Sequence, residues 1–302
     1  MHDALSAPIA VMGYDRPDAL ATAVASLTRC SGFAGRRVHL FCDAPAGPGS
    51  EAGVAQVREL ARSFCDHYGA RLVLRTQNLG FRNITQAMSE LCSEHGCAVS
   101  IEDDLVLAPG FLSFIDGALA TYAKDPRVFH VSGYTLGGVM PTAPTAFFLP
   151  VPMPWGWATW ERAWRRFTWE AEGASRVLEN PMARRAFDLD GAYPAAALLE
   201  RTLAGRFESY FIRWYLAMFL AGGLALCPRV SLVENRGASS GVHARQGAGL
   251  DRRRRYLSGS MPDGEKPAPA KGLTWPRTVA VDAESLTQLR SFLGTLRGRA
   301  AD

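Results

Sequence analysis

Three consecutive carboxylates, Glu102, Asp103 and Asp104, follow the apolar segment CAVSI. Adjacent carboxylates at the end of a buried strand repel one another unless a positive charge lies among them. Mg2+ and Mn2+ suit such a place, because hard divalent cations prefer oxygen ligands and bind one or two protein carboxylates together with substrate phosphates. A solvated acidic loop or a helix cap is the alternative. The apolar strand before the acids favours a Mn2+ or Mg2+ site.

The first half of the chain alternates strand patterns with helix patterns. Short apolar runs in 7–14, 37–43, 71–75 and 97–104 predict strands. Helices are expected after the first strand, over 51–69 and over 83–96, and a fourth after Pro109 and Gly110. Asn83 is the expected N-cap of the third, and Gly69 and Gly96 are expected to end theirs. This alternation predicts an α/β fold with a mostly parallel central sheet flanked by helices.

Polar side chains follow these predicted strands directly. They are Asp15, Asp43, Asn78 and the three acids at 102–104. Ligands of parallel sheets bind beyond the carboxyl ends of the strands, which share one edge. We therefore expect these side chains to line one binding site.

The second half loses this alternation. Strands are predicted over 128–134, 145–151 and 224–237, and helices over 195–203, 212–220 and 285–296. The segment 155–169 contains five tryptophans, of which Trp157, Trp160 and Trp164 have the helical spacings of three and four that typify a buried face. Residues 244–271, rich in Gly, Pro and Arg, read as a loop or linker.

Composition narrows the classes further. The 302 residues carry a formal net charge of +4, which suits an anionic ligand but is too small to indicate nucleic acid. Six cysteines without a CxxC pair make a zinc site or a disulfide framework unlikely, and they suggest reduced thiols. We read neither a signal peptide nor a membrane span, and expect a cytoplasmic protein. The arginine run 252–255 leaves open a peripheral contact with the membrane.

Two segments resemble known transferases. IEDDLVLAPGF looks like the metal-binding segment of the N-acetylglucosaminyltransferase I family, whose members are inverting glycosyltransferases of the GT-A fold. WGWATWERAW is similar to a segment of bacterial sugar transferases, and the likeness runs from about residue 8 to 245. The resemblance implies metal-dependent transfer of a sugar, with inversion, from a nucleotide-sugar donor to a glycan or lipid-linked glycan. A UDP-sugar is the expected donor.

The same resemblance implies a division of the chain. Residues 1–135 would form the nucleotide-sugar-binding half of one GT-A domain and residues 136–245 its acceptor-side half. Residues 246–302 would add a flexible basic loop and a C-terminal helix.

The resemblance also implies residue roles for the donor. Asp104 would be the direct metal ligand, and Glu102 and Asp103 would contact the ribose and the sugar. The remaining donor contacts would come from Arg16 beside the base, Asp43 at the uracil or ribose, Arg82 and Asn83 at the diphosphate or sugar, and Ser240 and Gly241 at the phosphates. His243 would bind metal or phosphate. Plain alternatives are a surface turn for Arg16, a helix-start charge for Arg82 and a solvated loop for His243.

The resemblance assigns the acceptor-binding residues and the general base less directly than the donor-binding residues. Trp155 and Trp157 would face the acceptor, while Trp160 and Trp164 belong to the core. Relatives place a catalytic aspartate at a position that corresponds here to Phe211, so Glu208 is the candidate general base. Glu208 as a helix-start charge is the alternative. Without a base, the chain would be a catalytically weak or inactive GT-A-like protein that binds sugar nucleotides or acts as a scaffold.

Overall fold

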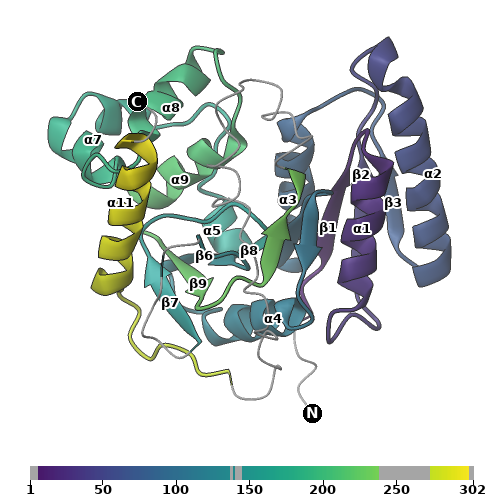
Figure 1. The fold of residues 1–302 in the computed structure, drawn as a ribbon, viewed down its shortest axis with the longest axis horizontal. Helices are drawn as coiled ribbons and strands as arrows, with labels where there is room; N and C mark the ends of the chain where they lie inside the picture. The colour runs from purple at the N-terminus through teal and green to yellow at the C-terminus, as the bar shows by residue number, and fades with distance from the viewer. Residues whose placement is uncertain (1–5, 137–138, 140–144, 238–272, 299–302) are drawn as a thin grey trace.

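Eight strands form the central sheet of this computed structural model, which describes residues 6–136, 139, 145–237 and 273–298 (Figure 1). The strands, in spatial order, are β3 (Arg71–Leu74), β2 (Val38–Cys42), β1 (Ile9–Gly13), β4 (Cys97–Ile101), β8 (Trp157–Trp160), β6 (Val128–Ser132), β9 (Leu224–Pro228) and β7 (Ala146–Leu149). Only β8 and β7 run against the other six. The predicted α/β fold with a mostly parallel sheet is confirmed.

The first half has the predicted alternation. Helices α1 (Pro17–Thr28), α2 (Glu51–Tyr68) and α3 (Phe81–His95) connect β1 to β4. Figure 1 shows α1 and α2 on one side of the sheet and α3 on the other. β1, β2 and β4 are buried along their whole length, as central parallel strands are, and β3 at the edge is partly exposed. Gly69 and Gly96 end their helices in the left-handed conformation, as predicted.

Two local predictions are wrong. The N-cap of α3 is Gly80. Asn83 is buried within the first turn, where its side chain accepts a hydrogen bond from Arg75, just after β3, and donates one to the carbonyl of Phe41 on β2. Trp157 and Trp160 lie on strand β8, which pairs antiparallel with β4, and helix α5 (Glu161–Trp164) begins only afterwards. Alternation on this strand directs Trp157 toward Trp214 and sends the Trp160 indole to the carbonyl of Leu119 on the other side.

The later part of the chain supplies the other four strands of the sheet. The helices not yet named are α4 (Phe111–Thr121), α6 (Ala174–Leu178), α7 (Pro181–Phe187), α8 (Ala195–Leu203), α9 (Tyr210–Leu220) and α11 (Ala283–Gly298). A small antiparallel ribbon of β5 (Leu105–Leu107) and β10 (Val233–Asn235) stands beside the acidic segment. The predicted linker 244–271, with the arginine run 252–255, lies outside the described residues.

Candidate active site

A cleft of about 680 Å³ opens where β1, β2 and β4 end. Its lining includes polar side chains from five separate segments: Asp15, Arg16, Asp43, Asn78, Asn83, Glu102, Asp103 and Glu208. Of the residues expected to share one site, Asp15, Asp43, Asn78, Glu102 and Asp103 line this cleft, whereas Asp104 does not. Volume and lining are those of a small-molecule site, which typically holds a few convergent polar groups.

Arg16 supplies a positive charge to the acidic segment. Its guanidinium contacts both carboxylate oxygens of Asp103, and two of its nitrogens lie 3.3 Å from Oδ2 of Asp104. Arg16 sits at the N-cap of α1, directly before Pro17, which places its side chain over the end of β4. The carboxylates therefore have a cationic partner within the chain itself. The sequence had suggested that this partner, Arg16, lies beside the nucleobase.

Burial changes the protonation of the acidic segment. It raises the pKa of Glu102 to about 8, with further increases from the charges of Asp104 and Asp103. It also raises the pKa of Asp103 to about 7, against the opposing effect of Arg16. The Tyr210 hydroxyl lies 3.4 Å from Oε1 of Glu102 and donates to it. Such raised values mark carboxylates that lack full compensation of their charge.

Asp104 is held from the side of β10. Its backbone carbonyl accepts a hydrogen bond of 2.8 Å from the amide of Arg236, and its Oδ1 lies 3.5 Å from Nδ2 of Asn235. The α-carbon of Gly237 packs so closely that a Cβ there would overlap with the Asp104 carboxylate. Asp104 itself is not part of the cleft lining and is 14% exposed.

These acids are suitable ligands for a hard cation, but they do not enclose one. In the described part of the chain, no group of three or more His, Cys, Asp or Glu residues could hold a metal ion. Carboxylate oxygens nevertheless match the preference of Mg2+ and Mn2+, which usually bind through one or two carboxylates and substrate phosphates. The donor set therefore fits a metal that is completed by a ligand's phosphates.

Asp43 binds backbone amides at the far side of the cleft. Its carboxylate accepts hydrogen bonds from the amides of Leu79 (2.9 and 3.0 Å), Gly80 (2.8 Å) and Ala44 (3.0 Å). It is 3% exposed. Asp43 thus fixes the turn that leads into α3 while lining the cleft. Sequence reasoning had not anticipated this use of its oxygens.

The two donor candidates on α3 have different surroundings. Asn83 lines the cleft, and its Oδ1 accepts a hydrogen bond of 2.9 Å from Nε of Arg75. Arg82 is exposed and does not line the cleft; its guanidinium lies 4.1 Å from the ring centre of Trp169. The candidate base Glu208 is exposed and lines the cleft with Glu102 and Asp103.

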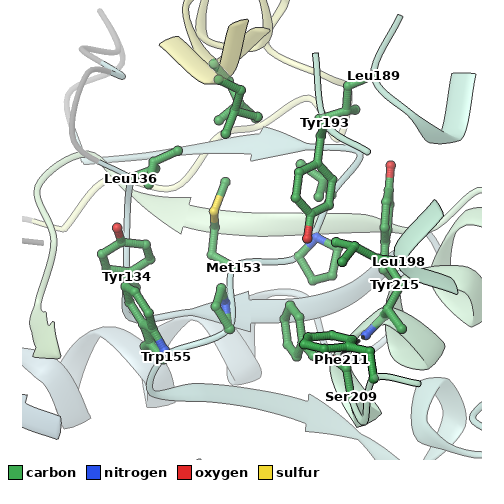
Figure 2. A pocket seen from close by; sticks show the side chains of 17 residues that line it. Tyr134, Leu136, Met153, Trp155, Leu189, Tyr193, Leu198, Ser209, Phe211 and Tyr215 are labelled. Carbon is green, nitrogen blue, oxygen red and sulfur yellow. Dashed lines mark hydrogen bonds between the residues drawn. The ribbon is translucent and has the colours of Figure 1, made fainter. Parts of the chain in front are cut away.

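The acceptor candidates separate in the structure. Trp157 is 0% exposed within a cluster of aromatic rings that includes His130 and Trp214, so it offers no face to a ligand. The expectation that it faces the acceptor is therefore corrected. Trp155 lines a second pocket of about 310 Å³, with Phe211 on its wall (Figure 2). Trp160 and Trp164 are buried in the core, as predicted.

Some residues near the acids were not predicted from the sequence, and some predicted residues lie outside the described ranges. Tyr210 and Asn235 meet the acids from more than 100 residues away, and no local motif marks them. The candidates Ser240, Gly241 and His243 lie outside the described residues. No helix in the described ranges has the length and apolar character needed to cross a membrane.

Comparison with known proteins yields likeness at the level of structure only. No protein-family model matches the sequence, and no curated protein matches it. TarS from S. aureus is 11% identical, with 97% of this chain and 91% of that chain covered at a TM-score of 0.41. GalNAc-T7, solved with UDP, GalNAc and Mn2+, is 10% identical at a TM-score of 0.48, with 78% of this chain and 44% of that chain covered.

Glucosyl-3-phosphoglycerate synthase from Mycobacterium tuberculosis, solved with Mn2+ and UDP, is 12% identical at a TM-score of 0.34, with 52% of this chain and 56% of that chain covered. The match to GalNAc-T7 thus spans less than half of that chain, and the match to TarS in its complex with UDP covers 46% of this chain and 40% of that chain. Identities and TM-scores this low assign neither a family nor an activity to the chain.

Proposed function

We propose that this chain is a glycosyltransferase that takes a sugar from a nucleotide-sugar donor, with UDP as the expected nucleotide, and transfers it to a glycan or lipid-linked glycan with inversion. The observation that carries the proposal is the polar cleft at the carboxyl ends of β1, β2 and β4, with carboxylates and Arg16 on one wall and Glu208 facing the same space. Ligands of parallel sheets bind at this edge. The likeness of the acidic segment to known sugar-transferase motifs points the same way.

Different residues would bind different parts of the nucleotide-sugar donor and the metal. Arg16 and the backbone held by Asp43 would position the nucleoside and its phosphates, with Asn83 at the sugar side. Asp104 is our proposed ligand for Mn2+ or Mg2+, with His243 as a second candidate. When bound, such a cation supplies positive charge that stabilises the leaving diphosphate. Glu102 and Asp103 would then hold donor hydroxyls.

Glu208 would act as the general base. The acceptor hydroxyl oxygen forms a bond with the anomeric carbon while the bond from that carbon to the diphosphate breaks. The hydroxyl proton passes to the Glu208 carboxylate, which requires that carboxylate within hydrogen-bond reach of the acceptor. Attack from the face opposite the diphosphate produces inversion.

Calorimetry with UDP and Mn2+ tests the proposal. Wild-type protein is expected to bind UDP in a Mn2+-dependent manner, and Asp104→Asn to weaken that binding at least roughly tenfold. Asp66→Asn, at an exposed position of α2, is the matched control and should bind like wild type. Absence of binding by wild type, or equal binding by Asp104→Asn, would refute the proposal.

A second candidate function is donor binding without efficient transfer. Its support is Phe211, which stands where relatives have an aspartate and which packs among aromatic rings on the wall of the second pocket. Slow hydrolysis of the donor separates the two candidates. Release of sugar by wild type but not by Glu208→Gln would favour the transferase, whereas binding of UDP without any release favours the second candidate.

A further inference from the structure

The second pocket is almost entirely apolar. None of its 17 lining residues carries a formal charge. Its walls are the segment Val151–Trp155, side chains of α8 and α9, and Leu289 and Leu293 of α11. Figure 2 shows these side chains converging from separate elements on one space. About 310 Å³ is near the lower limit for small-molecule sites and suits one aromatic ring or a short alkyl chain.

The hydroxyls of the lining are those of Tyr134, Tyr193, Ser209 and Tyr215. Figure 2 shows the Tyr193 hydroxyl directed inward among the apolar side chains. This hydroxyl has no hydrogen-bond partner within the described part of the chain, whereas the hydroxyl of Tyr215 on the same wall donates to the carbonyl of Phe187 at 3.0 Å. Water can hydrate this hydroxyl in the empty pocket, and the oxygen of a ligand that displaces the water would accept a hydrogen bond from it.

The pocket adjoins the polar cleft through one short segment. Glu208 lines the cleft, while Phe207, Ser209 and Phe211 line the pocket. The backbone at Ser209 is extended, and successive side chains of an extended segment point to opposite sides. The candidate base and the apolar pocket are therefore two sides of the same stretch of backbone.

We propose that this pocket binds an apolar group of the acceptor, an aryl or short alkyl substituent next to the sugar that is glycosylated, with the Tyr193 hydroxyl donating to an oxygen of that substituent. This inference rests on the proposed function. It also assigns a role to Trp155, whose ring packs edge-on against Tyr134 at a centroid distance of 4.6 Å on the pocket wall.

Acceptor specificity tests the inference. Phenyl, hexyl and methyl glycosides of the same hexoses would be compared as acceptors for the donor that binds. We expect kcat/KM to be roughly tenfold or more higher for a phenyl or hexyl glycoside than for the methyl glycoside, the range for filling an apolar pocket. The phenyl and hexyl arms distinguish an aromatic from an aliphatic substituent.

Variants then connect this preference to the pocket. Leu293→Trp fills the pocket from α11. It should bring the ratio of kcat/KM for the phenyl glycoside to kcat/KM for the methyl glycoside close to one. Ser291→Trp, at an exposed position of the same helix, should leave the ratio unchanged. Tyr193→Phe keeps the ring but removes the donor. We expect it to reduce kcat/KM severalfold for a 4-methoxyphenyl glycoside, whose substituent carries an oxygen, and to leave the phenyl-to-methyl ratio unchanged.

Failure of the inference and failure of the proposed function give different results. Binding of UDP with a phenyl-to-methyl ratio of one in wild type, or an unchanged ratio in Leu293→Trp, overturns the inference and leaves the proposed function standing. If UDP does not bind, the proposed function fails. Direct binding of benzyl alcohol then tests the pocket alone: binding that Leu293→Trp abolishes supports an apolar ligand site, and its absence in wild type overturns one.

Discussion

The guanidinium of Arg16 forms an ion pair with the carboxylate of Asp103, which lies 87 residues later in the sequence, and it also lies beside Asp104. The contact joins the loop after β1 to the end of β4, two strands that are neighbours in the sheet. Since Asp103 is 7% exposed at its side chain and Arg16 is 26% exposed, the pair is only partly screened by water. Four predictions test the consequences of this arrangement and of the contacts around it.

Loss of the Arg16 charge should destabilise the fold. Arg16→Met would leave Asp103 buried without its partner, and we expect the free energy of unfolding to fall by about 2 kcal/mol at pH 8, less than for a fully buried pair. The loss should shrink at pH 5, where Asp103 is protonated in the folded protein. Chemical denaturation at the two pH values measures both effects. Arg62→Met, which breaks only the exposed pair with Glu59, should change stability by at most about 0.5 kcal/mol. Equal effects of the two substitutions would contradict this interpretation.

Glu102 should make the metal-free protein less stable as pH rises. Burial raises the pKa of Glu102 from 4.5 to about 8, so the folded state binds more protons than the unfolded state between these values. The free energy of unfolding therefore falls as pH increases through this window, and the contribution is unaffected below it. Glu102→Gln removes this charge and should be more stable than wild type at pH 8 by at least about 1 kcal/mol, with little difference at pH 4. Thermal unfolding in the presence of a chelator checks this; a gain that is the same at both pH values would argue against a titrating Glu102.

Asp43 should be required for the turn before α3. In Asp43→Asn one oxygen is replaced by an amide nitrogen, which would face a backbone amide of Leu79 or Gly80 in place of accepting from it. We expect a loss of about 2 kcal/mol, as for hydrogen bonds to a charged group. Hydrogen exchange at the amides of Leu79 and Gly80 should accelerate, while Asp66→Asn leaves it unchanged. Protection of both amides in Asp43→Asn would show that the turn is held by other contacts.

The packing of Gly237 against Asp104 predicts opposite effects for two glycine substitutions. Gly237→Ala introduces a Cβ that overlaps with the Asp104 carboxylate and should destabilise the protein and weaken Mn2+-dependent UDP binding. Gly294→Ala, inside α11 with open space around it, should stabilise by about 0.5 to 1 kcal/mol. Thermal unfolding of both variants and UDP calorimetry make the comparison. A neutral Gly237→Ala would mean that Asp104 can shift freely.

Local sequence patterns were sufficient for most of the first half. Apolar runs identified β1 to β4, and Gly69 and Gly96 marked helix ends, because both signals depend on near neighbours in the chain. The position of polar residues after these strands also predicted where the cleft lies, since parallel strands end at one edge. The same patterns failed at Trp157–Trp160, where a spacing of three fits a helical face, yet the segment is needed as the strand between β4 and β6.

The sequence by itself determined the α/β architecture and the identity of the charged groups at the site, because strand and helix periodicity and residue type are properties of short segments. Only the tertiary structure decided what those groups contact. It paired Arg16 with Asp103, assigned the oxygens of Asp43 to backbone amides, buried Trp157 and placed Phe211 on the wall of an apolar pocket. Each of these outcomes depends on partners far away in the chain, and the energy of a buried charge or ring is set by those partners and by the exclusion of water.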